Sequence, residues 1–150
     1  MPSDPIYLTA WKKIAELIGV DFAAGYSGYD LTDRVFRGSM AEAPMIPSAC
    51  IFMFDIREDF GQVLTRYQAE ILFEVYGFCG GTTLEDRIDN ASRLGADFIN
   101  ALTSDRSLGN IGTDDVLCNF IAMNGDKYGI DGIGIAYLEI KVKFQSDRGV

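Results

Sequence analysis

One cysteine in this chain occupies a position where a reactive thiol could form. Cys79 and the two glycines that follow it come directly before a predicted helix, and a helix N-terminus lowers the pKa of a nearby thiol. Nucleophilic cysteines are usually activated by a neighbouring base such as histidine, and the chain contains no histidine. Cys50 and Cys118 also lie in or beside apolar stretches, and three widely spaced cysteines do not suggest a disulfide framework. We therefore interpret all three as small buried hydrophobic residues.

Two pairs of aspartates could in principle hold a metal ion: Asp114 with Asp115, and Asp126 with Asp131. The second pair lies in the turn NGDKYGIDG, which lacks the ligand spacing of a calcium loop and the glutamate at its twelfth position. The G-x-G of YGIDGIGIAY leads into a predicted strand, which is the wrong context for a dinucleotide site. We therefore expect no catalytic residue, no metal ion and no cofactor, and predict that the protein is not an enzyme.

Charge and composition exclude further classes of function. The 150 residues carry a formal net charge of -9, and lysine and arginine form no cluster that could grip a nucleic acid backbone. No apolar run is long enough to span a bilayer, so we expect no membrane association. The first residues have no apolar signal core, which favours a protein made in a cytoplasm. A chain of this length with 48% hydrophobic residues is expected to form a single domain over residues 1–150.

Two helices are predicted to position the remaining elements. The first covers Pro5–Ile18, with Asp4 as its cap, and the second covers Thr83–Thr103, with Thr82 and Glu85 forming a capping box. Each helix has one apolar face at helical spacing. These faces consist of Leu8, Trp11, Ile14, Ala15 and Ile18 in the first helix, and of Leu84, Ile88, Ala91, Gly95, Phe98 and Leu102 in the second.

Strand patterns predict one antiparallel sheet of about four main strands. The predicted strands are Ala49–Arg57, Glu70–Phe78, Asp114–Met123 and Ile133–Gln145. An irregular segment at about 19–48 precedes them and includes a short strand at Leu31–Phe36. In the last strand apolar residues alternate with polar ones, as in a sheet covered on one side only. We therefore predict an α+β fold of order α-β-β-α-β-β, with both helices packed on the sheet.

Eight side chains are candidates for contacts with other subunits or proteins. Four are aromatic residues in predicted loops, where contacts form, and four lie on the polar face of the last strand. They are Tyr26, Tyr29, Phe60, Tyr67, Tyr137, Glu139, Lys141 and Lys143. The alternative for each aromatic ring is that it covers the core locally, and the alternative for each lysine is that it contacts only water.

The order of elements resembles that of the tail terminator proteins of long-tailed bacteriophages, also called tail completion or head–tail joining proteins. The resemblance runs from Pro5 to Gln145 and includes Pro47 before the first strand, the phrase ALTSDRSLG (101–109) at the end of the long helix, and the closing strand AYLEIKVKFQ. It implies a structural virion protein of the neck, assembled in the host cytoplasm. Its subunits would form a homo-oligomeric ring, a hexamer, that caps the completed tail tube. The partners of this ring would be the tail tube protein on one side and the head-completion or connector protein on the other. DNA would pass through the lumen without sequence-specific binding, and no cofactor is implied.

Three other readings remain open at this point. The chain could be another virion component, such as a tail tube subunit or a head-completion protein. It could be a cellular α+β domain that binds a small ligand, which requires a pocket. It could also be an enzyme that uses carboxylates or Cys79.

Overall fold

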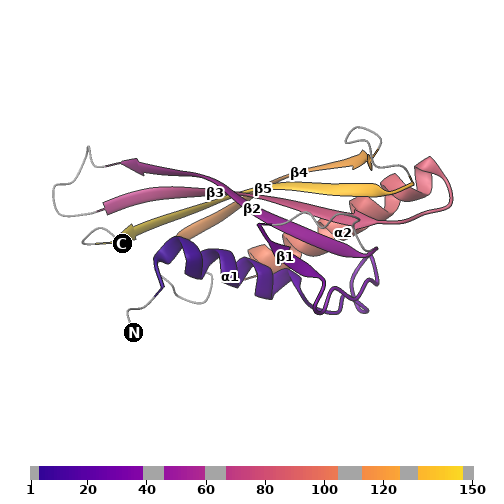
Figure 1. Cartoon of the computed structure of the whole chain (residues 1–150), viewed down its shortest axis with the longest axis horizontal. Helices are drawn as coiled ribbons and strands as arrows, with labels where there is room; N and C mark the ends of the chain where they lie inside the picture. Colours follow the sequence, from indigo (N-terminus) through magenta and orange to yellow (C-terminus); the bar gives the residue numbers. More distant parts are fainter. Residues whose placement is uncertain (1–3, 39–45, 60–66, 105–112, 126–131, 147–150) are drawn as a thin grey trace.

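The computed structural model describes residues 4–38, 46–59, 67–104, 113–125 and 132–146. Two helices and five strands follow one another in the order α1 (Ile6–Ile18), β1 (Val35–Arg37), β2 (Ser48–Asp59), β3 (Tyr67–Cys79), α2 (Leu84–Thr103), β4 (Thr113–Asn124) and β5 (Gly134–Ser146). The chain is therefore an α+β protein, as the sequence predicts. The sheet is open, and both helices lie on one side of it (Figure 1).

The sheet is mixed and has five strands in the order β1-β2-β3-β5-β4, so the predicted antiparallel sheet of about four main strands gains a short fifth strand at its edge. Residues Val35–Arg37 pair in parallel with Ala49–Ile51, while every other neighbouring pair is antiparallel. The predicted short strand at Leu31–Phe36 begins too early, because Leu31 is instead a fully buried residue before β1. β5 lies between β3 and β4, so the last strand made becomes a central strand of the sheet.

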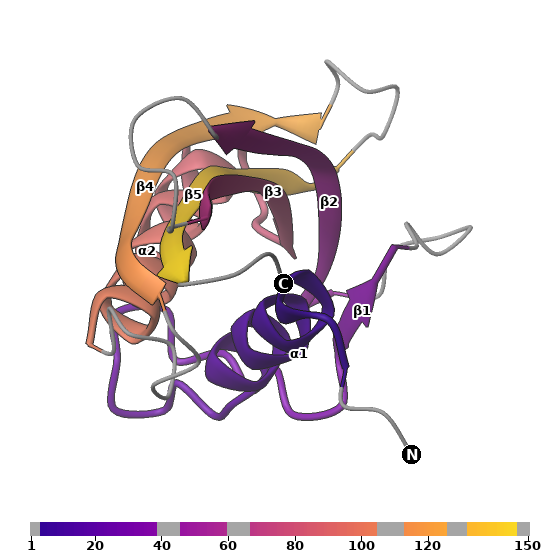
Figure 2. The same cartoon turned by 90° about the vertical axis from the view of Figure 1, so that its left-hand side faces the viewer.

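Each helix covers a different part of the same sheet face. α1 packs against β1, β2 and α2, while α2 packs against β3, β5 and β4. Viewed from the end, the sheet arches over the helices (Figure 2). The core between them contains the following fully buried side chains: Ile14, Ile18, Ile71, Phe73, Val75, Leu94, Phe98, Leu138 and Ile140. The alternation predicted for the last strand is therefore confirmed at Leu138 and Ile140.

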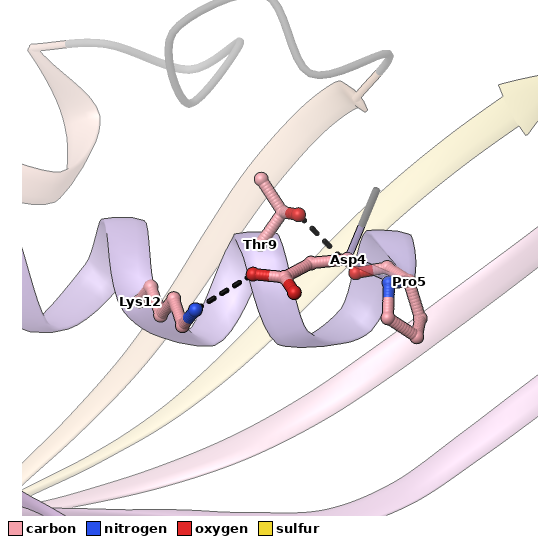
Figure 3. Close-up of polar contacts among 4 residues, drawn as sticks. All are labelled: Asp4, Pro5, Thr9 and Lys12. Carbon is pink, nitrogen blue, oxygen red and sulfur yellow. Dashed lines mark hydrogen bonds and ion pairs between the residues drawn. The ribbon is translucent and has the colours of Figure 1, made fainter. Parts of the chain in front are cut away.

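The caps of both helices differ from the predicted ones. Pro5 is the N-cap of α1, so Asp4 lies one residue too early to accept from the first amides, and no side chain caps this end. Asp4 instead forms an ion pair with Lys12, at 2.6 Å between Oδ2 and Nζ, while the Thr9 hydroxyl donates to the Pro5 carbonyl (Figure 3). Gly19 ends the helix.

The cap of α2 is Thr83, one residue after the predicted one. The Asp86 amide donates to the Thr83 hydroxyl oxygen at 3.1 Å, and the Thr82 hydroxyl donates to the Asp86 carboxylate at 2.8 Å. Glu85 therefore takes no part in a capping box. Leu84 is the first residue of the helix and is 47% exposed, so its predicted place on the apolar face is wrong.

The face of the sheet without helices is only partly polar. At one end it carries a second apolar cluster of the buried residues Cys50, Phe78, Ile133 and Ile135, with Phe36, Phe52, Tyr76 and Met123 packed against it. The prediction of one apolar and one polar face is therefore too simple. This face changes from apolar to charged along the strands.

Candidate interaction surface on the helix-free face

Strand register places side chains of β3 and β5 in rows across the helix-free face. Opposite pairs from one end to the other are Tyr76 with Tyr137, Glu74 with Glu139, Leu72 with Lys141, and Glu70 with Lys143. Because side chains alternate between faces, all eight lie on the side opposite the core. We call these eight residues the β3–β5 surface.

The first row of the β3–β5 surface is aromatic. The rings of Tyr76 and Tyr137 lie with their centroids 5.1 Å apart, and Phe52 of β2 meets Tyr76 edge-on at 5.9 Å. On the other side of Tyr137, Ile121 of β4 is its register partner and is 57% exposed. Aromatic and apolar side chains therefore form a continuous band across four strands.

The second row contains two carboxylates that face each other. The Tyr137 hydroxyl lies 2.5 Å from a carboxylate oxygen of Glu74 and 3.0 Å from one of Glu139, and the Tyr76 hydroxyl lies 3.3 Å from Glu74. Like charges directly opposite on a sheet are destabilising, so the tyrosine hydroxyls offset part of this cost. Burial, followed by the hydrogen bonds to Glu74 and Glu139, raises the pKa of Tyr137 well above its usual range. Its hydroxyl therefore keeps the proton that it donates.

The end of the β3–β5 surface farthest from the tyrosines is basic. Its two lysines share one acidic partner. The Nζ atoms of Lys141 and Lys143 lie 4.0 and 3.9 Å from the two carboxylate oxygens of Glu70. All three side chains are partly exposed, so these ion pairs contribute less than about 1 kcal/mol each to stability. Such residues can exchange these partners for groups on another protein at little cost.

The structure brings half of the predicted contact residues together. Tyr137, Glu139, Lys141 and Lys143 lie in one line along β5 and belong to the β3–β5 surface. Phe60 falls outside the residues that the structure describes. Tyr67 begins β3, and its side chain is not among those described.

Tyr26 and Tyr29 lie on the helix side, in the loop between α1 and β1. A buried carboxylate of α2 holds this loop: Asp97 is 3% exposed and accepts from the amides of Tyr26 and Ser27, both at 2.8 Å. The Ser27 hydroxyl donates to the same group at 2.5 Å. Tyr26 is 67% exposed at the tip, whereas Tyr29 is partly buried and packs against the core. These two tyrosines therefore cannot act together with the β3–β5 surface in one flat contact.

The cysteine that could in principle act as a nucleophile lies in the core, away from the β3–β5 surface. Cys79 is fully buried, and burial raises the pKa of its thiol to about 11, the opposite of what a nucleophile needs. Within the ranges that the structure describes, no three acidic, cysteine or histidine side chains gather as a metal site would require. No helix there is long and apolar enough to cross a membrane.

No protein-family model matches this chain. A comparison with curated proteins found no significant match either.

Sequence reasoning missed the acids and the tyrosine of β3 as members of the surface. Glu70, Glu74 and Tyr76 share one face of β3 through alternation along the strand, but only the register with β5 shows which residues they meet. Asp97 was also missed, although its position in the sequence carried a signal. It lies directly before Phe98 and three residues after Leu94, which places an acid on the apolar side of α2.

Proposed function

We propose that this chain is a tail terminator subunit of a long-tailed bacteriophage. Six copies form a ring that caps the completed tail tube and offers a surface to the head connector proteins. The resemblance of its sequence over Pro5–Gln145 supports this proposal, and so does an α+β fold with both helices on one side of the sheet.

The β3–β5 surface is the observation that carries the proposal. No described helix covers this sheet face, and aromatic, acidic and basic rows follow one another along it, with Leu72 buried among them. Contacts between proteins use such surfaces, with aromatic anchors beside charged groups that fix orientation. The net charge of -9 also fits a ring through which DNA passes without binding.

The first experiment measures the mass of the purified chain over a concentration series, alone and with tail tubes. A hexamer, or smaller species that become hexamers only on tail tubes, is the expected result. Long tubes formed by the chain alone would identify a tail tube subunit instead. A monomer that ignores tail tubes would overturn the proposal in favour of a cellular binding domain.

A charge reversal on each side of the sheet tests the role of the β3–β5 surface. Lys141→Glu places a third acid beside Glu70 and Glu139, and should weaken tube binding at least about ten-fold, or about 1.4 kcal/mol. Lys12→Glu makes the same substitution on the exposed side of α1, where the lysine pairs with Asp4, and should change binding by less than about two-fold. Equal losses in both variants would show that net charge alone decides binding.

A further inference from the structure

A cavity lies between the loop that follows α1 and the last turns of α2, on the helix side of the molecule. Its volume is about 520 Å³, which is within the range of small-ligand sites. The residues that line it include Phe22, Gly25 and Tyr26 of the loop, and Asp97 and Asn100 of α2. We call it the loop–α2 cavity. It shares no described residue with the β3–β5 surface.

A buried carboxylate lines this cavity. Asp97 accepts hydrogen bonds from the amides of Tyr26 and Ser27 and from the Ser27 hydroxyl, and all three donors are neutral. No lysine or arginine in the described ranges forms an ion pair with it. A buried carboxylate without a cation is costly. A cation bound in the cavity would therefore gain an attraction that is stronger than the same contact in water.

Gly25 leaves one carboxylate oxygen of Asp97 accessible from the cavity. A carboxylate has about four acceptor positions. Oδ2 accepts from both groups of Ser27, whereas Oδ1 accepts only from the Tyr26 amide. A Cβ atom on Gly25 would lie 2.5 Å from Oδ1, so any other residue would fill the space beside this oxygen. The backbone of Gly25 is not left-handed, so its conformation does not require glycine. The glycine therefore keeps the space beside Oδ1 clear.

The loop side of the cavity is held in place and contributes two aromatic rings. The Phe22 amide donates to the Tyr29 carbonyl at 2.8 Å, and the Phe22 ring packs against Phe98 of α2 with the centroids 6.0 Å apart. The second ring, that of Tyr26, is mostly exposed. Aromatic faces attract cations, and the apolar stem of a long cationic side chain packs well against them. Asn100 on α2 adds an exposed amide oxygen that can accept a further N–H.

We propose that the loop–α2 cavity binds a cation carried on an apolar stem, an alkylguanidinium or alkylammonium group such as the side chain of arginine or lysine. The charged end donates to Oδ1 of Asp97 beside Gly25, and the stem packs against Phe22 and Tyr26. A guanidinium fits best, because its planar fork of donors can reach both Oδ1 and the Asn100 amide oxygen while its face stacks on a ring. The net charge of -9 favours the approach of such a ligand.

This site goes beyond the proposed ring, which uses the β3–β5 surface on the other side of the sheet. The test therefore uses the isolated protein without tail tubes, and its outcome is independent of whether the chain binds them.

A neutral isostere separates recognition of the charge from burial of the stem. The probes are N-acetylarginine methylamide and N-acetylcitrulline methylamide, which has nearly the same shape but no charge. In a titration followed by heteronuclear NMR, the arginine probe should shift the amide signals of Tyr26 and Ser27 saturably. The citrulline probe should bind at least about ten-fold more weakly, because it cannot form a charge-assisted bond to Asp97. Equal affinities of the two probes, or no binding of the arginine probe, overturns the proposal.

Two acids of α2 provide a matched pair of variants. Asp97→Asn removes the charge but keeps an acceptor oxygen for the Tyr26 amide, and should weaken binding of the arginine probe at least about ten-fold. Asp89→Asn removes the same charge from an exposed position of the same helix, where solvent and salt screen it, and should change the affinity by less than about two-fold. Equal losses in both variants would mean that net charge alone attracts the probe, which overturns the site.

Tyr26→Ala is a second variant, needed because Asp97→Asn also alters the contact with Ser27. It removes an exposed ring and keeps the backbone amide that Asp97 accepts from. The arginine probe should bind at least about three-fold more weakly to this variant, through the lost stacking on the ring. An unchanged affinity would overturn the assignment of Tyr26 to the site.

The source of the cation is tested with a free amine. N-acetyllysine methylamide and cadaverine, a free diamine, are titrated beside the arginine probe. Binding of the arginine or lysine probe at least as tight as that of cadaverine identifies a protein side chain as the ligand, whereas tighter binding of cadaverine identifies a small amine. A protein that binds none of the three overturns the proposal.

Discussion

Gly95 of α2 lies against the ring of Phe120 in β4 with no room for a side chain between them. A Cβ atom on Gly95 would be 2.1 Å from a ring carbon of Phe120, far inside van der Waals contact. Glycine in the middle of a helix costs about 0.5–1 kcal/mol relative to alanine. At this position the close approach of helix and strand offsets that cost.

Gly95→Ala should therefore destabilise the protein, whereas the same change at an exposed helical position usually stabilises it. We expect a loss of about 1–3 kcal/mol in the free energy of unfolding, because Phe120 or the helix must move. Urea denaturation measures this loss. Ser92→Ala on the exposed side of the same helix serves as the control and should stay within about 0.5 kcal/mol of the wild type. A more stable Gly95→Ala variant would contradict the observed packing.

Leu138→Asp should prevent stable folding. Leu138 is fully buried on the core face of β5, where no described cation could pair with a carboxylate. An uncompensated buried charge costs about 3–5 kcal/mol, a large part of the stability of a domain this size. Circular dichroism and thermal unfolding report the effect. Lys143→Asp in the same strand but on the β3–β5 surface should remain folded, and an unfolded Lys143→Asp variant would show that any acid in β5 is harmful.

Asp97→Ala should release the loop that carries Tyr26. The substitution leaves the amides of Tyr26 and Ser27 without their acceptor, at a cost of about 1–3 kcal/mol in the free energy of unfolding. Hydrogen exchange at these two amides should accelerate more than exchange in β3. Asp89→Ala removes an exposed acid from the same helix and should change neither quantity. Unchanged exchange at Tyr26 and Ser27 would mean that Asp97 does not hold the loop.

Stability should fall at alkaline pH partly through Tyr137. Its pKa is raised by burial and by hydrogen bonds to Glu74 and Glu139, so the folded state favours the protonated phenol. The stabilising contribution is complete below the unfolded pKa of about 10 and is lost as the pH rises above it. Urea denaturation at pH values on both sides of 10 should show a steeper loss for the wild type than for Tyr137→Phe. Parallel losses in the two proteins would assign the alkaline sensitivity to other groups.

The sequence predicts well the elements that are defined by the spacing of nearby residues. Helical spacing locates both helices, and alternation along β5 assigns Leu138 to the core and Tyr137 to the other face, as the structure confirms. Each observed N-cap lies one residue after the predicted one. Thr82 and Thr83 are both suitable caps for α2, and Asp4 before Pro5 is a suitable cap for α1, so the sequence alone does not decide between neighbouring positions.

Long-range pairing is what the sequence could not predict. β1 pairs in parallel with β2 through only three residues, and three residues carry no periodic signal. The meeting of Glu74 with Glu139 depends on the register between strands separated by a whole helix and a further strand. The apolar end of the helix-free face likewise arises only when Phe78 and Ile135 become neighbours.

The place of β5 between β3 and β4 has a consequence for synthesis on the ribosome. β3 and β4 both emerge before β5, yet one edge of β3 and the described strand pairing of β4 depend on β5. A nascent chain that ends before Gly134 therefore leaves one edge of β3 and the whole of β4 without their β5 partner, and exposed edges are what chaperones must shield from neighbouring chains. Codon choice that slows translation within β4 would lengthen this exposure, whereas rapid translation through β5 would end it.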